Sequence, residues 1–364
     1  MAPGTARSLT ISSQSEGLSG LVFRDTEIPQ NLKDHEVLVE LRAASLNYRD
    51  IVLATGNMPH TSLKTRPDVI LGSDGAGIVL KVGSSVTSLQ PGDKVITHMT
   101  PSEYPASTGL GRLDGEALPA MAHISAGLGQ ELDGTFTTHG VFQESCLIKF
   151  DGHLSFEEAA TLTCSGLTAW NGLMGLRGRE VRKGDWVLVQ GSGGVSVAAL
   201  QFAVAAGATV VATTSSKDKA ERLRQLGASH IINYRDVPEW GVAAKELTPS
   251  KRGFDIIVDV GGDSTLGEAL KCIRRDGLIV LAGVRGEGQP VPLLSIIFSE
   301  IAVARGIILG SKDMFRDMLA FVEEHKIKLA LDTERFSLEE AKGALERLEQ
   351  QKHFSKVVVQ IPGK

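Results

Sequence analysis

The sequence contains few cysteines, few aromatic residues and no large excess of charge of either sign. Its three cysteines stand far apart, at positions 146, 164 and 272, and predict no disulfide framework. Aromatic residues make up 5% of the chain and the net charge is −5, which disfavours nucleic acid or an anionic membrane as a partner. No apolar run is long enough to span a bilayer. Residues 1–19 lack the apolar core of a signal peptide, so we expect a cytoplasmic protein.

The 364 residues suffice for two domains, and the local pattern changes near residue 157. Before it, short apolar runs separated by Gly, Pro and Asp predict a β-rich domain, with a half-buried strand at 36–41. Residues 98–135 break this rhythm and predict a lobe or long loop. After residue 157, strands and helices alternate as in a doubly wound parallel sheet, which makes the fold class α/β.

The most specific motif lies at residues 186–214. An apolar strand, the turn Gly191-Ser-Gly-Gly-Val-Ser196, an alanine-rich helix and a second strand form one βαβ unit. Glycines let the backbone approach a pyrophosphate, which the helix N-terminus then binds. A tight structural turn is the alternative. The strand before the turn and the helix after it favour a dinucleotide site built from Ser192, Gly193, Gly194 and Val195.

The end of the second strand indicates which dinucleotide is bound. NAD-selective units place an acidic residue there, whereas this chain has Thr and Ser followed by lysine. Hydroxyls and an ammonium group favour a 2′-phosphate, so we expect NADPH to be bound by Ser215, Ser216 and Lys219. Asp218 argues mildly against this. The alternative is an ordinary helix start that one of the two serines caps.

Other stretches, together with this motif, resemble the medium-chain dehydrogenase/reductase superfamily over nearly the whole chain. They are Asn47–Asp50, Gly72–Gly77, Leu162–Trp170, Ile232–Tyr234, Gly310–Phe315 and His353–Val357. The resemblance implies a GroES-like catalytic domain at 1–165, completed by 313–364, and a Rossmann NADP-binding domain at 166–312. It also implies an active site in the cleft between the domains.

The zinc branch of this superfamily has its metal ligands where this chain has Asn47, Ser73, Asp74 and Cys164. Asn and Ser are poor zinc ligands, and the lobe at 98–135 lacks the cysteines of a structural zinc site. We interpret Cys164 as a small buried apolar residue rather than a ligand. The spacing of three histidines also predicts no metal site: His98, His123 and His139. We therefore expect no metal.

Without zinc, hydrogen-bond donors must stabilise the charge that develops on a substrate oxygen. The resemblance places Asn47 and Tyr48 at the former metal position, and Tyr48 could also supply a proton. The alternative is that Tyr48 packs in the wall of the site and Asn47 fixes backbone or ribose. We interpret Arg49 and Asp50 as a structural pair.

The resemblance implies further cofactor contacts at Thr168, Tyr234, Gly261, Gly283, Val284, Leu309 and Lys356. Tyr234 could instead be a cover at a strand end, and Lys356 a surface lysine. The apolar run 301–309 predicts a strand that either pairs two subunits into a homodimer or is buried within one subunit.

These features favour a zinc-independent, NADPH-dependent oxidoreductase. We expect it to transfer a hydride to an activated C=C (enone or enoyl) or C=O of a hydrophobic small molecule. The alternatives are an NAD(P)-dependent alcohol dehydrogenase and a non-redox cyclising or binding protein that retains the fold. Residues 54–66 and 98–135 are the loops expected to set specificity.

Overall fold

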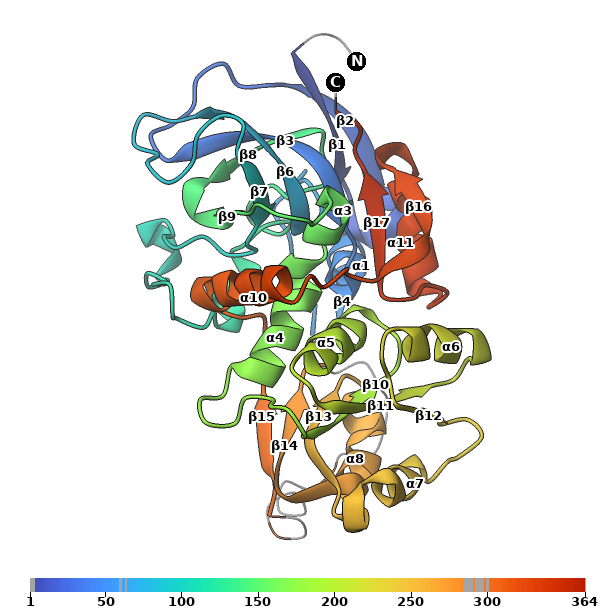
Figure 1. Cartoon of the computed structure of the whole chain (residues 1–364). Coiled ribbons are helices and arrows are strands. Elements are labelled where there is room, and N and C mark those ends of the chain that lie inside the picture. Colours follow the sequence, from blue (N-terminus) through green and yellow to red (C-terminus); the bar gives the residue numbers. More distant parts are fainter. Residues whose placement is uncertain are drawn as a thin grey trace. The chain divides into compact units, whose positions relative to one another are not determined.

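The computed structural model describes residues 4–58, 61–62, 64–283, 291, 298 and 301–363. The chain divides into two compact units (Figure 1). Unit 1 consists of Met1–Ser165 and Ser311–Lys364, and unit 2 is Gly166–Gly310. Both ends of the chain therefore belong to unit 1. Within the described residues, no helix has the length and apolarity needed to cross a membrane.

Unit 1 is built on a mixed seven-stranded sheet. Its strands run in the order β16-β17-β3-β6-β7-β9, and β8 also pairs with β3. Their bounds are β3 Glu36–Ser45, β6 Asp74–Val82, β7 Lys94–Thr97, β8 His139–Gln143, β9 Leu147–Lys149, β16 Leu331–Ser337 and β17 Lys356–Gln360. Two hairpins accompany the sheet: β1 Thr5–Ile11 with β2 Leu21–Glu27, and β4 Asn57–Met58 with β5 Thr61–Ser62.

The strand predicted at 36–41 is present as β3, but the expectation that it is half-buried is wrong. Only Glu36 and Arg42 are partly exposed along its length. β3 is the central strand, because β6, β8 and β17 all pair with it in antiparallel register. The core of unit 1 also packs on it, so both faces are covered.

The helices of unit 1 are mostly short. They are α1 Tyr48–Thr55, α2 Met121–Ser125, α3 Phe156–Ala159, α10 Lys312–Glu324 and α11 Ala341–Glu349. The segment 98–135 contains only α2 and the short 3-10 turn Ala106–Thr108 as helical structure, as the loss of periodicity predicts. α1 and α11 contribute apolar residues to one hydrophobic core with the sheet.

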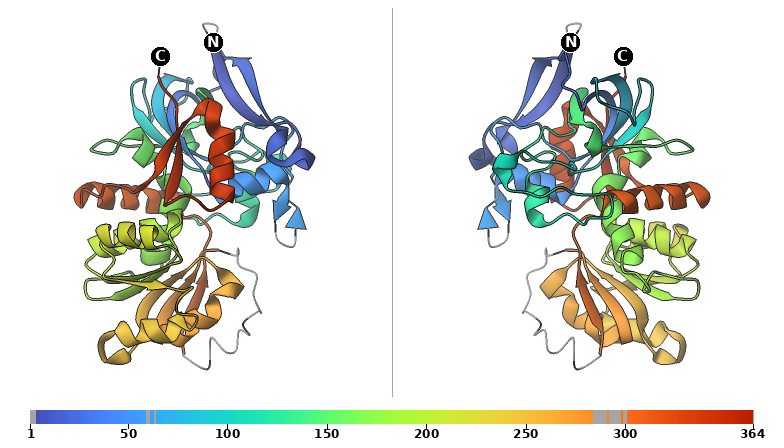
Figure 2. Two further views of the ribbon diagram at one scale, coloured as in Figure 1. Left: turned by 90° about the vertical axis from the view of Figure 1, so that its right-hand side faces the viewer. Right: turned by 90° about the vertical axis from the view of Figure 1, so that its left-hand side faces the viewer.

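Unit 2 has a six-stranded sheet in the order β12-β11-β10-β13-β14-β15, and every neighbouring pair is parallel. The strands are β10 Trp186–Gln190, β11 Thr209–Thr214, β12 His230–Asn233, β13 Phe254–Asp259, β14 Ile273–Leu281 and β15 Val303–Gly306. The helices are α4 Leu167–Met174, α5 Gly194–Ala205, α6 Lys217–Gln225, α7 Trp240–Leu247 and α8 Leu266–Cys272. Helices cover both faces of the sheet (Figure 2). The predicted doubly wound fold is confirmed.

The strand order reverses between β10 and β13. In sheets of this kind, ligands bind at the carboxyl ends of the strands beside such a switch point. The glycine turn follows β10 directly, so the fold brings the strongest sequence motif to this place.

The apolar run 301–309 differs from a buried core strand. Only Val303–Gly306 form β15, which pairs with β14 at the edge of the sheet. Ala304 and Gly306 are exposed, and Ile301 is 63% exposed. Burial within one subunit therefore does not account for the apolarity of this run.

Candidate active site

Asn47 is the residue before α1, where Asn commonly caps a helix with its side-chain oxygen. Here the side chain does not cap the helix. Its Oδ1 instead accepts hydrogen bonds from Lys356 Nζ at 2.5 Å and from Ser165 Oγ at 3.5 Å. The Asn47 backbone N–H donates to the Asp50 carboxylate at 2.7 Å, which fixes the start of the helix. The Asn47 side chain is thus released from a local structural role.

Lys356 is the first residue of β17 and is 4% exposed. Besides Asn47 Oδ1, its ammonium donates to Leu46 O at 2.6 Å and to Asp74 Oδ2 at 3.2 Å. An ammonium group has three N–H donors, so these three acceptors use all of them. In this arrangement Lys356 is neither a surface lysine nor left with a donor for a phosphate.

Asp74 begins β6 and is completely buried. Apart from Lys356, its carboxylate accepts hydrogen bonds from Ser45 Oγ, Ser73 Oγ and the Cys164 backbone N–H at 3.2, 2.9 and 3.3 Å. We call Ser45, Asn47, Ser73, Asp74 and Lys356 the Lys356 network. The fold therefore brings together Asn47, Ser73, Asp74 and Cys164, the four positions at which the resemblance implies the metal ligands of the zinc branch.

The residues at these positions do not fit a catalytic zinc ion. Such a site needs three Cys, His or carboxylate ligands, and here Asn47 and Ser73 supply an amide and a hydroxyl. The ammonium of Lys356 already neutralises Asp74 and contacts Asn47. Among the described residues, no group of three or more His, Cys, Asp or Glu side chains is placed to hold a metal.

Cys164 is half-buried rather than fully buried, which differs from our interpretation. Burial, with the nearby Asp74 carboxylate, raises the pKa of its thiol to about 12. The thiol is therefore protonated at neutral pH and is a poor nucleophile.

Arg49 and Asp50 form no salt bridge among the described residues, although each charge affects the pKa of the other group. The Arg49 guanidinium donates instead to the carbonyls of Ile124 and Leu128 and to Gln130 Oε1. Asp50 is completely buried, and its Oδ1 has no hydrogen-bond partner among the described residues. Desolvation is the main cause that raises the pKa of Asp50 to about 7.

Tyr48 is the first residue of α1, directly after Asn47, and is 37% exposed. Asn47 Nδ2 is buried and has no hydrogen-bond partner in the described part of the chain. An amide donor and a phenol thus stand side by side in the sequence, at the border between the buried network and an accessible surface. Each of these two groups is a hydrogen-bond donor suited to an oxygen atom.

In unit 2, the turn after β10 has the geometry of an anion site. Gly191 has φ of 75°, which a side chain disfavours. α5 begins after Gly193 with no side-chain cap, so the amides of its first turn are open to a ligand. A Cβ at Gly193 would meet no atom within 4 Å. Ser196, in the place of the third glycine, donates to Gln190 O at 2.6 Å and ties the helix to its strand. This cradle fits a dinucleotide pyrophosphate.

Four predicted nucleotide residues lie at the ends of the neighbouring strands β11 and β12. Ser215, Ser216 and Lys219 are half-exposed, and Tyr234 is 41% exposed. Ser216 caps α6, since its Oγ accepts from the Lys219 backbone N–H at 3.4 Å. The capping role and a phosphate contact are compatible, because a hydroxyl that accepts one hydrogen bond can still donate another.

The other predicted cofactor residues are spread over unit 2. Thr168 is buried in α4, and Leu309 is buried with φ of 52°. Gly261 and Gly283 follow β13 and β14. A Cβ at Gly283 would lie 2.2 Å from Val260 O, so close backbone packing already requires glycine there. Val284 lies outside the described residues. Of the described residues in this set, Gly261 and Gly283 lie at the carboxyl edge of the parallel sheet.

The sequence reading missed Asp259, the last residue of β13. Its carboxylate accepts from Gln190 Nε2 at 2.8 Å, from the Gly262 N–H at 2.8 Å and from Thr265 Oγ1 at 2.9 Å. It thereby ties the end of β10 to the loop after β13. The signal was an acidic residue directly after the apolar run Ile256–Val258 of a buried strand, where a charge needs partners.

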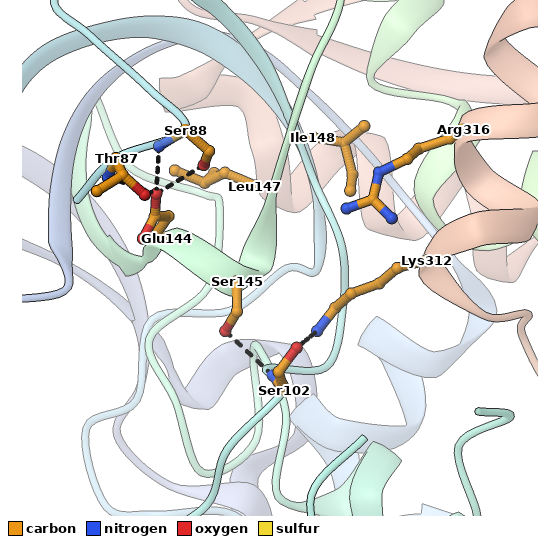
Figure 3. Close-up of a pocket in the computed structure, with 9 residues that line it drawn as sticks. All are labelled: Thr87, Ser88, Ser102, Glu144, Ser145, Leu147, Ile148, Lys312 and Arg316. Carbon is orange, nitrogen blue, oxygen red and sulfur yellow. Dashed lines mark hydrogen bonds between the residues drawn. The ribbon is translucent and has the colours of Figure 1, made fainter. Parts of the chain in front are cut away.

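Unit 1 also has a hollow of about 330 Å³ that lies apart from the predicted site residues (Figure 3). Hydroxyl side chains and two cations line it, with Lys312 donating to Ser102 Oγ at 2.6 Å. Lys312 is 6% exposed, and burial lowers its pKa to about 8. None of the predicted catalytic or cofactor residues lines this hollow.

The fold of the two units and the residues of these sites indicate a class of protein, and comparisons with known proteins identify the same class. Residues 33–153 match the family model "Alcohol dehydrogenase GroES-like domain", and residues 194–324 match "Zinc-binding dehydrogenase". The chain belongs to the medium-chain dehydrogenase/reductase superfamily and is an oxidoreductase that resembles alcohol dehydrogenases.

Within the superfamily, the chain is 41% identical to the zinc-type alcohol dehydrogenase-like protein C1773.06c of Schizosaccharomyces pombe, over 96% of this chain and 98% of that protein. It is 32% identical to a crystal structure of an NAD-dependent alcohol dehydrogenase, with a TM-score of 0.84 over 98% of this chain and all of the other. The 2-octenoyl-CoA carboxylase reductase CinF, solved with NADP and 2-octenoyl-CoA, is 25% identical, with a TM-score of 0.83 over 100% of this chain and 90% of that one.

Proposed function

We propose that the protein is an NADPH-dependent reductase that acts without a catalytic metal on an activated C=C or C=O of a hydrophobic small molecule. The observation that carries this proposal is the buried Asn47 Nδ2, which has no hydrogen-bond partner among the described residues. It lies where the zinc branch holds its metal, in a network whose cation is an ammonium group. A buried N–H group without a partner is costly, so a ligand oxygen is its natural acceptor.

The reaction is balanced with one hydride and one proton. NADPH, held by the turn after β10 and by the residues after β11, would supply the hydride that the electrophilic carbon of the acceptor needs. Asn47 Nδ2 donates a hydrogen bond to the acceptor's carbonyl oxygen, where negative charge then develops. Tyr48, the next residue in the sequence, supplies from its hydroxyl the proton that neutralises that charge, and solvent reprotonates the phenolate.

Support for NADPH comes from the residues after β11. That strand end has no acidic residue, and Ser215, Ser216 and Lys219 offer donors suited to a 2′-phosphate. CinF, which was solved with NADP and an enoyl-CoA, has a similar fold. The NAD-dependent alcohol dehydrogenase among the similar structures makes an alcohol dehydrogenase that uses NAD the second candidate.

The test is turnover with a panel of enones, enoyl thioesters, quinones and aldehydes, using NADPH deuterated at the transferred position. We expect label on the product carbon and activity that a chelator does not abolish. An inactive protein that binds no NADPH by calorimetry would refute the proposal. A requirement for added zinc would favour the alcohol dehydrogenase instead.

Variants of the two donors test their roles. Asn47→Ala should lower kcat about 100-fold or more, the usual effect of removing one preorganised donor to an oxyanion. Tyr48→Phe should lower kcat with little change in NADPH affinity. Full turnover by Tyr48→Phe would show that Tyr48 only packs in the wall of the site and that solvent supplies the proton.

We also propose a homodimer that pairs through β15. Support comes from the position of this strand at the edge of its sheet and from the exposure of Ile301 beside it. An unpaired strand edge offers backbone donors and acceptors to a second chain. Light scattering should give twice the mass of the chain, and a monomer at micromolar concentration would contradict this.

A further inference from the structure

The orientation of the Asn47 amide is determined by its partners. An ammonium group can only donate, so the amide must turn its oxygen toward Lys356 Nζ, 2.5 Å away. The Ser165 hydroxyl, at 3.5 Å, lies on the same oxygen. The amide nitrogen therefore faces away from both, with no hydrogen-bond partner among the described residues.

Lys356 is itself held rigidly in place. Its three acceptors come from the Leu46 backbone, the Asn47 side chain and the Asp74 carboxylate, and the Asp74 carboxylate is further held by two serine hydroxyls and a backbone N–H. The ammonium cannot turn to another partner without leaving a buried carboxylate unpaired. Such a chain of hydrogen bonds fixes one arrangement of the amide and also polarises it.

We propose that Lys356 is a positioning residue that acts through Asn47: it turns the amide so that Nδ2 donates to the substrate oxygen, and it strengthens that donor. This inference rests on the proposed function and narrows its substrate class. The substrate must carry a carbonyl oxygen, either as the reduced group or conjugated with the reduced C=C. An alkene without a carbonyl has no acceptor for the donor and should not be reduced.

The test compares Lys356→Met with wild type and with Lys356→Arg, using an enone as substrate. We expect kcat to fall about 100-fold in Lys356→Met, because misplacement of a catalytic group by about 1 Å has an effect of this size. NADPH affinity, measured by calorimetry without substrate, should not change. Lys356→Arg keeps a cation that can donate to the amide oxygen, so it should recover part of the lost kcat.

A double-mutant cycle separates a role through Asn47 from any other role. In an Asn47→Ala background, Lys356→Met should lower kcat no further, because the amide it positions is gone. If Lys356 and Asn47 act independently, the kcat of the double variant will instead fall by the product of the two single losses. If Lys356→Met does not fold, Lys356→Met/Asp74→Asn removes both charges and keeps hydrogen-bonding atoms at Asp74, and the same kcat loss is expected.

Lys312→Met is the matched control, since Lys312 is also a buried lysine of unit 1 but contacts Ser102 in the hollow of Figure 3. Its kcat should equal that of wild type. An unchanged kcat in Lys356→Met, or an equal loss of NADPH affinity, would overturn the positioning role while leaving the proposed function intact. A wild-type protein that reduces no carbonyl-containing acceptor would refute both the positioning role and the proposed function.

Discussion

The Lys356 network of unit 1 and the glycine turn of unit 2 are built in opposite ways. In the network, charged side chains are buried and both oxygens of Asp74 have hydrogen-bond partners. The exception among the network's buried polar atoms is Asn47 Nδ2, which has no partner among the described residues. In the turn, side chains are small or missing, and uncapped backbone amides remain open. The first arrangement places single atoms precisely, which chemistry on a substrate requires. The second leaves space and a general affinity for anions, which suits a cofactor that is bound and released.

The buried charge pair makes the network the more fragile of the two regions. Asp74→Ala leaves the Lys356 ammonium buried without a carboxylate, so it should lower the free energy of unfolding by about 3–5 kcal/mol. Denaturant unfolding measures this. Asp68→Asn is the control, because Asp68 pairs with Arg24 at the surface and its loss should change stability by at most about 1 kcal/mol. Equal effects of the two variants would contradict the comparison.

The turn should instead lose binding without losing stability. Gly193 has φ of −80° and open space at its Cβ, so Gly193→Val should fold normally. The new side chain fills the cradle, and NADPH affinity should fall at least about 100-fold, equivalent to about 2.8 kcal/mol. Calorimetry with NADPH and thermal unfolding check the two parts. Undiminished NADPH affinity would place the pyrophosphate elsewhere.

The residues after β11 sharpen the comparison because they are expected to decide between NADPH and NADH. Lys219→Ala should weaken NADPH binding about 10-fold, the expected effect of losing a charge-assisted hydrogen bond, while NADH binding stays the same. Lys217→Ala is the matched control, as an exposed lysine on the same helix. If both variants weaken NADPH equally, the effect is one of general charge rather than a contact with the 2′-phosphate.

The last prediction concerns the pH dependence of stability and rests on Asp50, the buried carboxyl beside the network. Its pKa of about 7 in the folded protein exceeds the usual 3.8, so between about pH 4 and pH 7 the folded state holds a proton that the unfolded state has lost. Stability from this group is therefore present at low pH and falls as pH rises, by at most about 1.4 kcal/mol per pH unit. Asp50→Asn should gain stability over wild type at pH 8 compared with pH 5, as measured by Tm. A pH-independent difference would contradict this.

Local sequence patterns predicted unit 2 better than unit 1. The alanine-rich helix α5 and the turn after β10 depend on neighbouring residues, so the local sequence pattern reveals them. β3 was predicted as a strand, but its place inside the sheet depends on its pairing with β17, more than 300 residues away in the chain. Arg49 and Asp50 were interpreted as a structural pair. Adjacent residues on a helix do not face each other, and the Arg49 guanidinium donates its hydrogen bonds to the segment 124–130.

The sequence alone determined the superfamily, the α/β class and the location of the dinucleotide motif, because each depends on residues close together in the chain. Only the tertiary structure decided what replaces the ligands of the zinc branch. Lys356 looked like a surface or cofactor lysine at the start of an apolar strand. The pairing of β17 with β3 brings its ammonium to Asn47 and Asp74. A buried ammonium needs acceptors, and these lie just after β3 and at the start of β6, which only the folded sheet brings to Lys356.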